Sequence, residues 1–270
     1  MLQSVHRDVT LLNFVFLCIA TAFLFIGSPA TASEKAVELK EVGTAVAIRR
    51  RLTGTLGEEK RRLRKGARIH RDELLETSRR GRAELQLDDQ TKLAIGPRAQ
   101  LKLDDFVLGK SDGVSTIALN FLKGTFRFIT GSKKSESYRI ETPSATIGVS
   151  GTVFDVYVDG KGDTLVLLHE GTVEICSKTR TCRRHNTVGR IIHATLAGAL
   201  SAPLKFTASL IPGVSVGGAF PFVGRRLTID PIRRLRRADI MGRSVTKRAG
   251  KTLRRGTRTI RRSLRKLSPF

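Results

Sequence analysis

The chain has 270 residues, 40% of them hydrophobic, with no Trp and a formal net charge of +25 at pH 7. This length and a composition that is globular on average argue against a wholly disordered chain and allow one large or two small domains. The charge far exceeds what a folded core requires, and it is unevenly distributed along the chain.

The N-terminal residues 1–32 have the parts of a secretory signal peptide. Arg7 precedes an apolar run over residues 11–26, and the GSPATAS that follows places Ala30 and Ala32 at the −3 and −1 positions of an A-x-A cleavage site. We therefore expect cleavage and a periplasmic or secreted protein. The alternative is an inner-membrane protein anchored by residues 11–26, although a full span requires about 20 apolar residues.

Hydrophobic residues recur at every second position through residues 37–192, as in RAELQL at 82–87. This alternation is typical of strands with one buried face, and glycines punctuate it. We predict an all-β domain, built as a short-stranded β-sandwich or as a β-solenoid-like fold. The spacing of fifteen between Gly66, Gly81 and Gly96 is compatible with a solenoid, but hairpins in a sandwich produce similar punctuation, so both alternatives stay open.

Two cysteines, Cys176 and Cys182, remain after Cys18 is removed with the signal peptide. LHEGTVEIC predicts a strand, SKTRT a polar turn, and CRR the start of the return strand. The two Cα atoms would face each other across this hairpin at bridging distance, and export favours oxidation, so we predict a Cys176–Cys182 disulfide. A zinc site is the alternative, but no second pair of Cys or His lies nearby to complete a tetrahedron.

Residues 193–224 are small and apolar, and they are interrupted by Pro203, Pro212 and Pro221. The prolines and Lys205 argue against a transmembrane helix, because lipid cannot satisfy the backbone groups that they would leave unpaired. We expect a flexible or loosely packed linker. Partial packing on the β domain, or contact with a membrane, is the alternative.

Residues 225–270 form a separate basic tail, with 17 Lys or Arg against two Asp, a net charge of +15. Repulsion between like charges predicts disorder in free solution. Apolar residues recur at helical spacing between 253 and 267, so a cationic amphipathic helix is expected on an anionic surface. The residues predicted to bind that surface are Arg254, Arg255, Arg258, Arg261, Arg262, Arg265 and Lys266.

The sequence gives no support for a catalytic, metal or cofactor site. GVSVG at 213–217 matches the nucleophile-elbow pattern, but Pro212 precedes it and no His follows His193. The histidines lack metal-ligand spacing, and the aspartates at 88–89 and 104–105 fall in expected turns. We therefore expect a non-enzymatic protein with no metal and no cofactor. A polysaccharide-active enzyme is the least favoured alternative.

The order of motifs in residues 37–192 resembles the FecR domain. ETPSATIGVSGTVFDVYV at 141–158 fits the pattern T-P-x-A-x-I-x-V-x-G-T-x-F, and LLHEGTVEIC at 167–176 supplies the later E-G-x-V. The resemblance implies an all-β periplasmic domain, in which Gln90 occupies a turn position usually given to Gly. The motif residues are Thr142, Pro143, Ala145, Ile147, Gly151, Thr152, Phe154, Glu170 and Gly171.

Regulators with this domain carry a cytoplasmic anti-sigma segment before a membrane span, but only about ten residues precede the apolar run here, so we expect no anti-sigma activity. We expect a non-catalytic interaction or signalling module of the bacterial envelope whose partner is an envelope protein or a glycan. The alternative is a structural protein whose tail binds anionic lipid, lipopolysaccharide or another polyanion. Export argues against nucleic acid, and the sequence predicts no oligomeric state.

Overall fold

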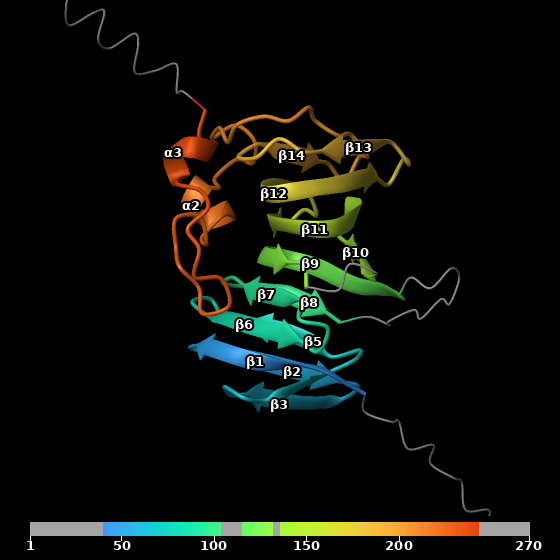
Figure 1. Cartoon of the computed structure of the whole chain (residues 1–270), viewed down its shortest axis with the longest axis vertical. Coiled ribbons are helices and arrows are strands. Elements are labelled where there is room, and N and C mark those ends of the chain that lie inside the picture. The colour runs from blue at the N-terminus through green and yellow to red at the C-terminus, as the bar shows by residue number, and fades with distance from the viewer. Residues whose placement is uncertain (1–39, 104–114, 132–135, 243–270) are drawn as a thin grey trace, which may run out of the picture. The chain divides into compact units, whose positions relative to one another are not determined.

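The computed structural model describes residues 40–103, 115–131 and 136–242, and these are mostly strand (Figure 1). The all-β prediction is confirmed. The described residues include two helices of one turn each, α2 (Val216–Ala219) and α3 (Arg237–Ile240). Within the described ranges, no helix has the length and apolar content needed to span a bilayer.

The strands follow one another in chain order with short connections. They are β1 (Glu41–Arg49), β2 (Leu52–Leu56), β3 (Glu59–Leu63), β4 (Arg68–His70), β5 (Leu74–Thr77), β6 (Arg82–Leu87), β7 (Lys92–Ile95), β8 (Gln100–Lys102), β9 (Ser115–Ile129), β10 (Glu136–Glu141), β11 (Ala145–Val158), β12 (Thr164–Ser177), β13 (Cys182–His185) and β14 (Ile191–Ala194).

Backbone pairing arranges these strands in two rows. Row A runs β4, β1, β6, β7, the second half of β9, the second half of β11, the first half of β12 and β14. Row B runs β3, β2, β5, β8, the first half of β9, β10, the first half of β11, the second half of β12 and β13. The structure has the two sheets of a sandwich, but three long strands pass through both of them.

The long strands change rows at glycine corners. β9 turns at Gly124, β11 at Gly151 and β12 at Gly171, where φ is 95°, 64° and 82°. Glycine reaches this left-handed region at little steric cost. A Cβ on Gly171 would lie 2.6 Å from the carbonyl oxygen of Gly151, so these two corners stack with no room for a side chain.

One side chain in two from each row points into a shared core. Row A contributes Phe126, Phe128 and Phe154, and row B contributes Phe121 and Tyr138, all of them buried. Phe121 stacks on Phe126 with 4.2 Å between ring centroids, and Phe128 meets the edge of Tyr138 at 5.2 Å. Each such side chain contributes roughly 1.5–3 kcal/mol through burial, which holds the two rows together.

Residues 204–242, the covering segment, pack on the outer face of row A. Leu165, Leu167 and Ile191 point outward from this row and join a buried cluster with Phe206 and Phe220. Nearer β7, Ala94 contacts Phe222 and Ile229. Figure 1 shows α2 and α3 in this segment, beside the strands. The prediction of a flexible or loosely packed linker over residues 193–224 is therefore wrong, and residues 225–242 are not part of a separate tail, because row A presents a second apolar face that this segment buries.

Candidate functional site

The motif residues of β11 and of the turn before it stabilise the turn and the strand. Thr142 Oγ1 accepts a hydrogen bond from the Ala145 amide and donates to the Ala145 carbonyl, both at 2.9 Å, and Pro143 lies in the turn that these bonds close. Ala145, Ile147 and Phe154 are buried in the core. The threonine and proline therefore set the start of β11, and the apolar residues fix its register.

The remaining motif residues lie at the stacked corners. The Thr152 amide donates to Thr130 Oγ1, and the Thr152 hydroxyl donates to the Thr172 carbonyl at 3.1 Å. Glu170 is exposed beside Gly171, and it accepts a hydrogen bond from Arg234 Nε at 3.1 Å. The motif thus builds the corners and, through Glu170, touches the covering segment.

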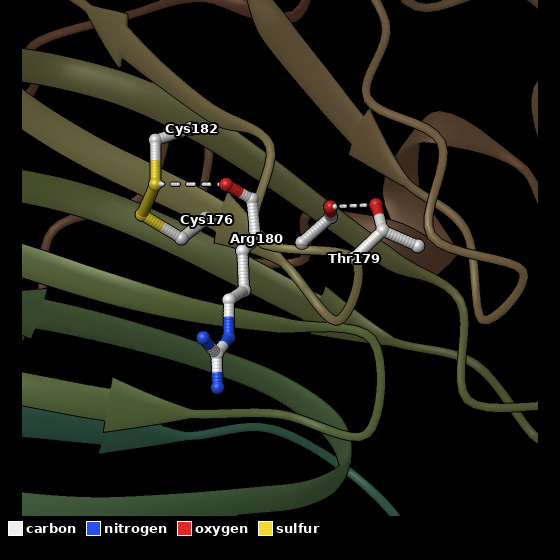
Figure 2. Close-up of a disulfide and its surroundings, with 5 residues drawn as sticks. Cys176, Thr179, Arg180 and Cys182 are labelled. Carbon is white, nitrogen blue, oxygen red and sulfur yellow. Dashed lines mark hydrogen bonds between the residues drawn. A yellow bond between two sulfur atoms is a disulfide. The ribbon is translucent and has the colours of Figure 1, made fainter.

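A disulfide closes the β12–β13 hairpin, as the sequence predicted (Figure 2). Cys176 and Cys182 are cross-strand partners with Cα atoms 4.0 Å apart, and their sulfurs are bonded at 2.06 Å. Between them the Arg180 amide donates to the Ser177 carbonyl at 3.0 Å, and Arg180 adopts a φ of 60°. The tight turn brings the two cysteines into register at the end of row B.

A buried ionic cluster joins the outer face of row A to the covering segment. Arg127 and Asp155, on β9 and β11, form a two-bond pair in which Nε lies 2.6 Å from Oδ1 and Nη2 lies 2.9 Å from Oδ2. Asp230 of the covering segment is 3.4 Å from Arg127 Nη1. His169 Nε2 lies 3.1 Å from Asp155 Oδ2, and Arg234 pairs with Asp230. These charges are compensated within the protein.

The cluster sets its own protonation state. Burial alone would raise the pKa of Asp155, but the charges of Arg127 and His169 and their hydrogen bonds outweigh it and hold the pKa well below its usual range. The pKa of Arg127 is raised by the two carboxylates despite the burial of its guanidinium. Asp155 and Arg127 are therefore both charged at neutral pH, and removing one would leave the other uncompensated.

The outer face of row B is open and polar. Two sets of outward-facing positions lie on it: Glu76 is the backbone partner of Gln100, and Arg139 is linked through Gly148 to Glu174, which pairs with Arg184. Arg139, Glu174 and Arg184 are exposed. Lys60 pairs with Glu76 at 3.3 Å, and Gln100 donates to Glu76 at 2.9 Å. Among the described residues, this surface of mixed charge is the outer face of the sandwich that no other segment covers.

Several predicted sites lie outside the described residues. These are the cleavage residues Ala30 and Ala32, the aspartates at 104–105, and the seven anion-binding residues Arg254, Arg255, Arg258, Arg261, Arg262, Arg265 and Lys266. Asp88 and Asp89 do lie in a turn, and Gln90 takes a φ of 74° there, the conformation usual for glycine. In the part of the chain that the structure describes, no group of three or more His, Cys, Asp or Glu residues could hold a metal.

The family comparison covers the middle of this architecture. Residues 73–174 match the FecR protein family. This FecR region begins just before β5 and ends within β12, so it includes the motif of β11, the three glycine corners and strands of both rows. The resemblance seen in the sequence is thus confirmed over these residues.

Two crystal structures of a protein described as a candidate anti-sigma factor from Parabacteroides distasonis ATCC 8503 are also similar to the chain. The identity is 14% and the TM-score is 0.39. The aligned part covers 47% of this chain and 57% of that protein, little more than half of its length. No curated protein sequence matches the chain.

Neither the ionic cluster nor the covered face was predicted from the sequence. Continuous apolar runs were the available signal, because a strand that is buried on both faces loses its alternation. TLVLLH at 164–169 and RIIHA at 190–194 are such runs. Arg127 alternates with Phe126 and Phe128 as an exposed residue would, and only the fold reveals that Asp155 and Asp230 meet it.

Proposed function

We propose that the protein is a non-catalytic interaction or signalling module of the bacterial envelope. The FecR match over residues 73–174 is the observation that carries this proposal. These residues supply most of the core and leave the outer face of row B open, so the matched part presents a surface to a partner. Its motif residues occupy structural positions at corners and in the core.

We place the protein in the periplasm, on the N-terminal sequence pattern and the Cys176–Cys182 disulfide, since structural disulfides persist in oxidising compartments. Fractionation of the native host with N-terminal sequencing tests this. The mature chain should be periplasmic and begin at Ser33. Recovery of intact residues 1–32 in the membrane fraction would instead support the anchored form.

We assign the partner-binding surface to the outer face of row B and its partner to an envelope protein. Alternating charges on a flat, uncovered sheet favour a polar protein surface of complementary charge. The charge reversals Arg139→Glu and Glu174→Lys, combined, invert this pattern without changing the net charge. In-cell crosslinking followed by mass spectrometry should find a partner that binds the wild type and is lost from this double variant.

The matched control exchanges charges in exposed turns, Lys161→Glu with Glu58→Lys, and it should retain the partner. Retention by both variants would move the interface away from row B. A purified envelope glycan that binds the wild type in place of any protein would overturn the assignment of a protein partner.

A second candidate function rests on residues 243–270, which follow the covering segment and still carry 11 Lys or Arg with no Asp or Glu, a charge dense enough for adsorption to an anionic envelope surface. Each basic residue near an anionic leaflet contributes about 1 kcal/mol. Substitution suits the test better than truncation at residue 224, because residues 225–242 pack on row A. The seven predicted residues, replaced by Gln, should abolish salt-sensitive co-sedimentation with phosphatidylglycerol vesicles. Unchanged sedimentation would remove this candidate.

A further inference from the structure

A cavity of ≈ 480 Å³ lies between the corners of the sandwich and the covering segment. Four cationic side chains line it, Arg79, Arg82, Arg98 and Lys123, together with Tyr157. The lining includes no Asp and no Glu. Its volume is in the range of small-molecule sites, about 300–1,000 Å³.

The fold brings these cations together by stacking corners. Arg79 and Arg82 flank the turn between β5 and β6, Arg98 lies in the turn between β7 and β8, and Lys123 precedes the corner of β9. Backbone bonds join these corners: the Arg98 amide donates to Ser78 at 3.2 Å, and the Gly96 amide donates to Thr125 at 2.7 Å. Neighbouring strands lie about 4.8 Å apart, so each corner adds a cation beside the last.

The covering segment closes the other side of the cavity in a fixed position. Thr125 donates from its hydroxyl to the Ala219 carbonyl at 2.9 Å, which ties α2 to the corner of β9. Glycines at 213, 217 and 218 line this wall. A Cβ on Gly217 would come within 3.1 Å of a terminal nitrogen of Arg237, so a further guanidinium lies against the same wall. The cavity is therefore formed by the fold itself.

The positive charges of the cavity are not balanced by acidic side chains of the described residues. Among the described residues, none of the four has an ion pair or a side-chain hydrogen bond, and Arg82 Nε is buried without a partner. Burial, then the nearby charges of Arg225 and Arg49, lower the pKa of Arg82. Elsewhere in the sheet, by contrast, Arg127 pairs with two carboxylates.

We propose that this cavity binds a compact ligand with two or more oxyanionic groups, phosphates or carboxylates. The planar guanidinium fork matches both groups through paired hydrogen bonds, and lysine adds a mobile point charge. Such a ligand would supply the countercharge that the corners lack, and the hydroxyl of Tyr157 would provide one further donor. This binding activity is independent of the proposed interaction role of row B.

Calorimetry of the full chain with pyrophosphate as the probe tests the proposal. Arg79→Gln with Lys123→Gln removes two exposed cations of the cavity, so folding should be preserved, which circular dichroism checks. We expect pyrophosphate affinity to fall about tenfold or more, because two charge-assisted contacts are lost. The matched control, Arg64→Gln with Lys65→Gln after β3, makes the same charge change at exposed residues outside the cavity and should keep the wild-type affinity.

Residues 243–270 are present in all these proteins, so binding by the tail cancels in the comparison. A parallel titration with citrate at equal ionic strength distinguishes carboxylate from phosphate recognition, and a cavity-dependent signal with either probe supports the site. Equal affinities of the two double variants for both probes would overturn the proposal, as would the absence of binding by the wild type.

Discussion

The two outer faces of the sandwich are built in part from the same long strands, but one face is covered and the other is exposed. β9, β11 and β12 each contribute one half to each row. In row A their outward residues include Arg127, Asp155 and Leu167, which are buried under residues 204–242. In row B the outward Glu174 of β12 is exposed, as is Arg139 of the neighbouring β10. One strand can therefore present a buried outward face and an exposed outward face on the two sides of a single glycine.

The largest expected effect contrasts apolar residues of the two faces. Phe220→Ala should lower the free energy of unfolding by about 3–5 kcal/mol, because it empties a fully buried site beside Phe206. On the open face, Leu122 is 42% exposed, and Leu122→Ala should change stability by less than about 0.5 kcal/mol. Chemical denaturation measures both. Similar losses would mean that the covering segment contributes little to stability.

Removing one charge of the buried cluster should lower the free energy of unfolding slightly less than Phe220→Ala does. Asp155→Asn leaves Arg127 without its main partner and should destabilise the protein by about 3 kcal/mol at pH 7. The folded pKa of Asp155 is depressed, so its contribution is complete above the unfolded value near 3.8 and is lost as pH falls below it. The gap between wild type and variant should therefore narrow below about pH 4.

The control for this pH dependence is Glu174→Gln on the open face, where the carboxylate is exposed. Its denaturation midpoint should follow the wild type across the whole range. A constant gap between wild type and Asp155→Asn down to pH 2 would contradict the ionic account of the cluster.

The disulfide should contribute less to the stability of the protein than the covered face does. Cys176→Ser with Cys182→Ser opens a loop of sequence separation 6, which corresponds to about 2 kcal/mol in the chain-entropy model. Thermal unfolding of the wild type with and without reductant provides the comparison, and the reduced wild type should match the variant. A variant as stable as the oxidised protein would show that β13 is held by its sheet pairing alone.

The smallest expected effect concerns His185 on β13. Its ring is buried and Nε2 lies 3.1 Å from the Arg190 carbonyl, and burial lowers its pKa. The neutral form is therefore favoured in the folded state, so stability is complete above about pH 6.5 and declines as pH falls below it. His185→Gln should flatten the stability profile between pH 7 and 5. An unaltered slope would assign that titration to another group.

The sequence predicted what depends on local pattern. Alternation gave the strands, the turn residues between Cys176 and Cys182 gave the hairpin and its disulfide, and the motif at 142–154 gave the family. These features are determined by neighbours along the chain, so they can be read from one sequence.

The covered face could not be predicted in the same way. Residues 204–242 contain prolines and glycines and have no regular period, which is typical of both a linker and an irregular packed segment. The apolar outer face of row A, on which these residues pack, shows that they form a packed segment and not a linker. The cavity is also non-local, because Arg79, Arg98 and Lys123 come from separate turns that meet only when the strands pair.

The contact between Arg127 and Asp230 links positions 103 residues apart, and Glu84 and Ile229 are separated by 145. Contacts between residues so far apart in the chain form late in folding, because the entropy cost of closing a long loop comes before the contact stabilises the protein. Row A is built from residues 41–194, so it can form before residue 230 docks on it. Until then the apolar outer face of row A, with Arg127 and Asp155, is exposed to solvent. The folding protein therefore passes through a stage with an exposed, apolar and charged sheet surface, and docking of the covering segment ends that stage.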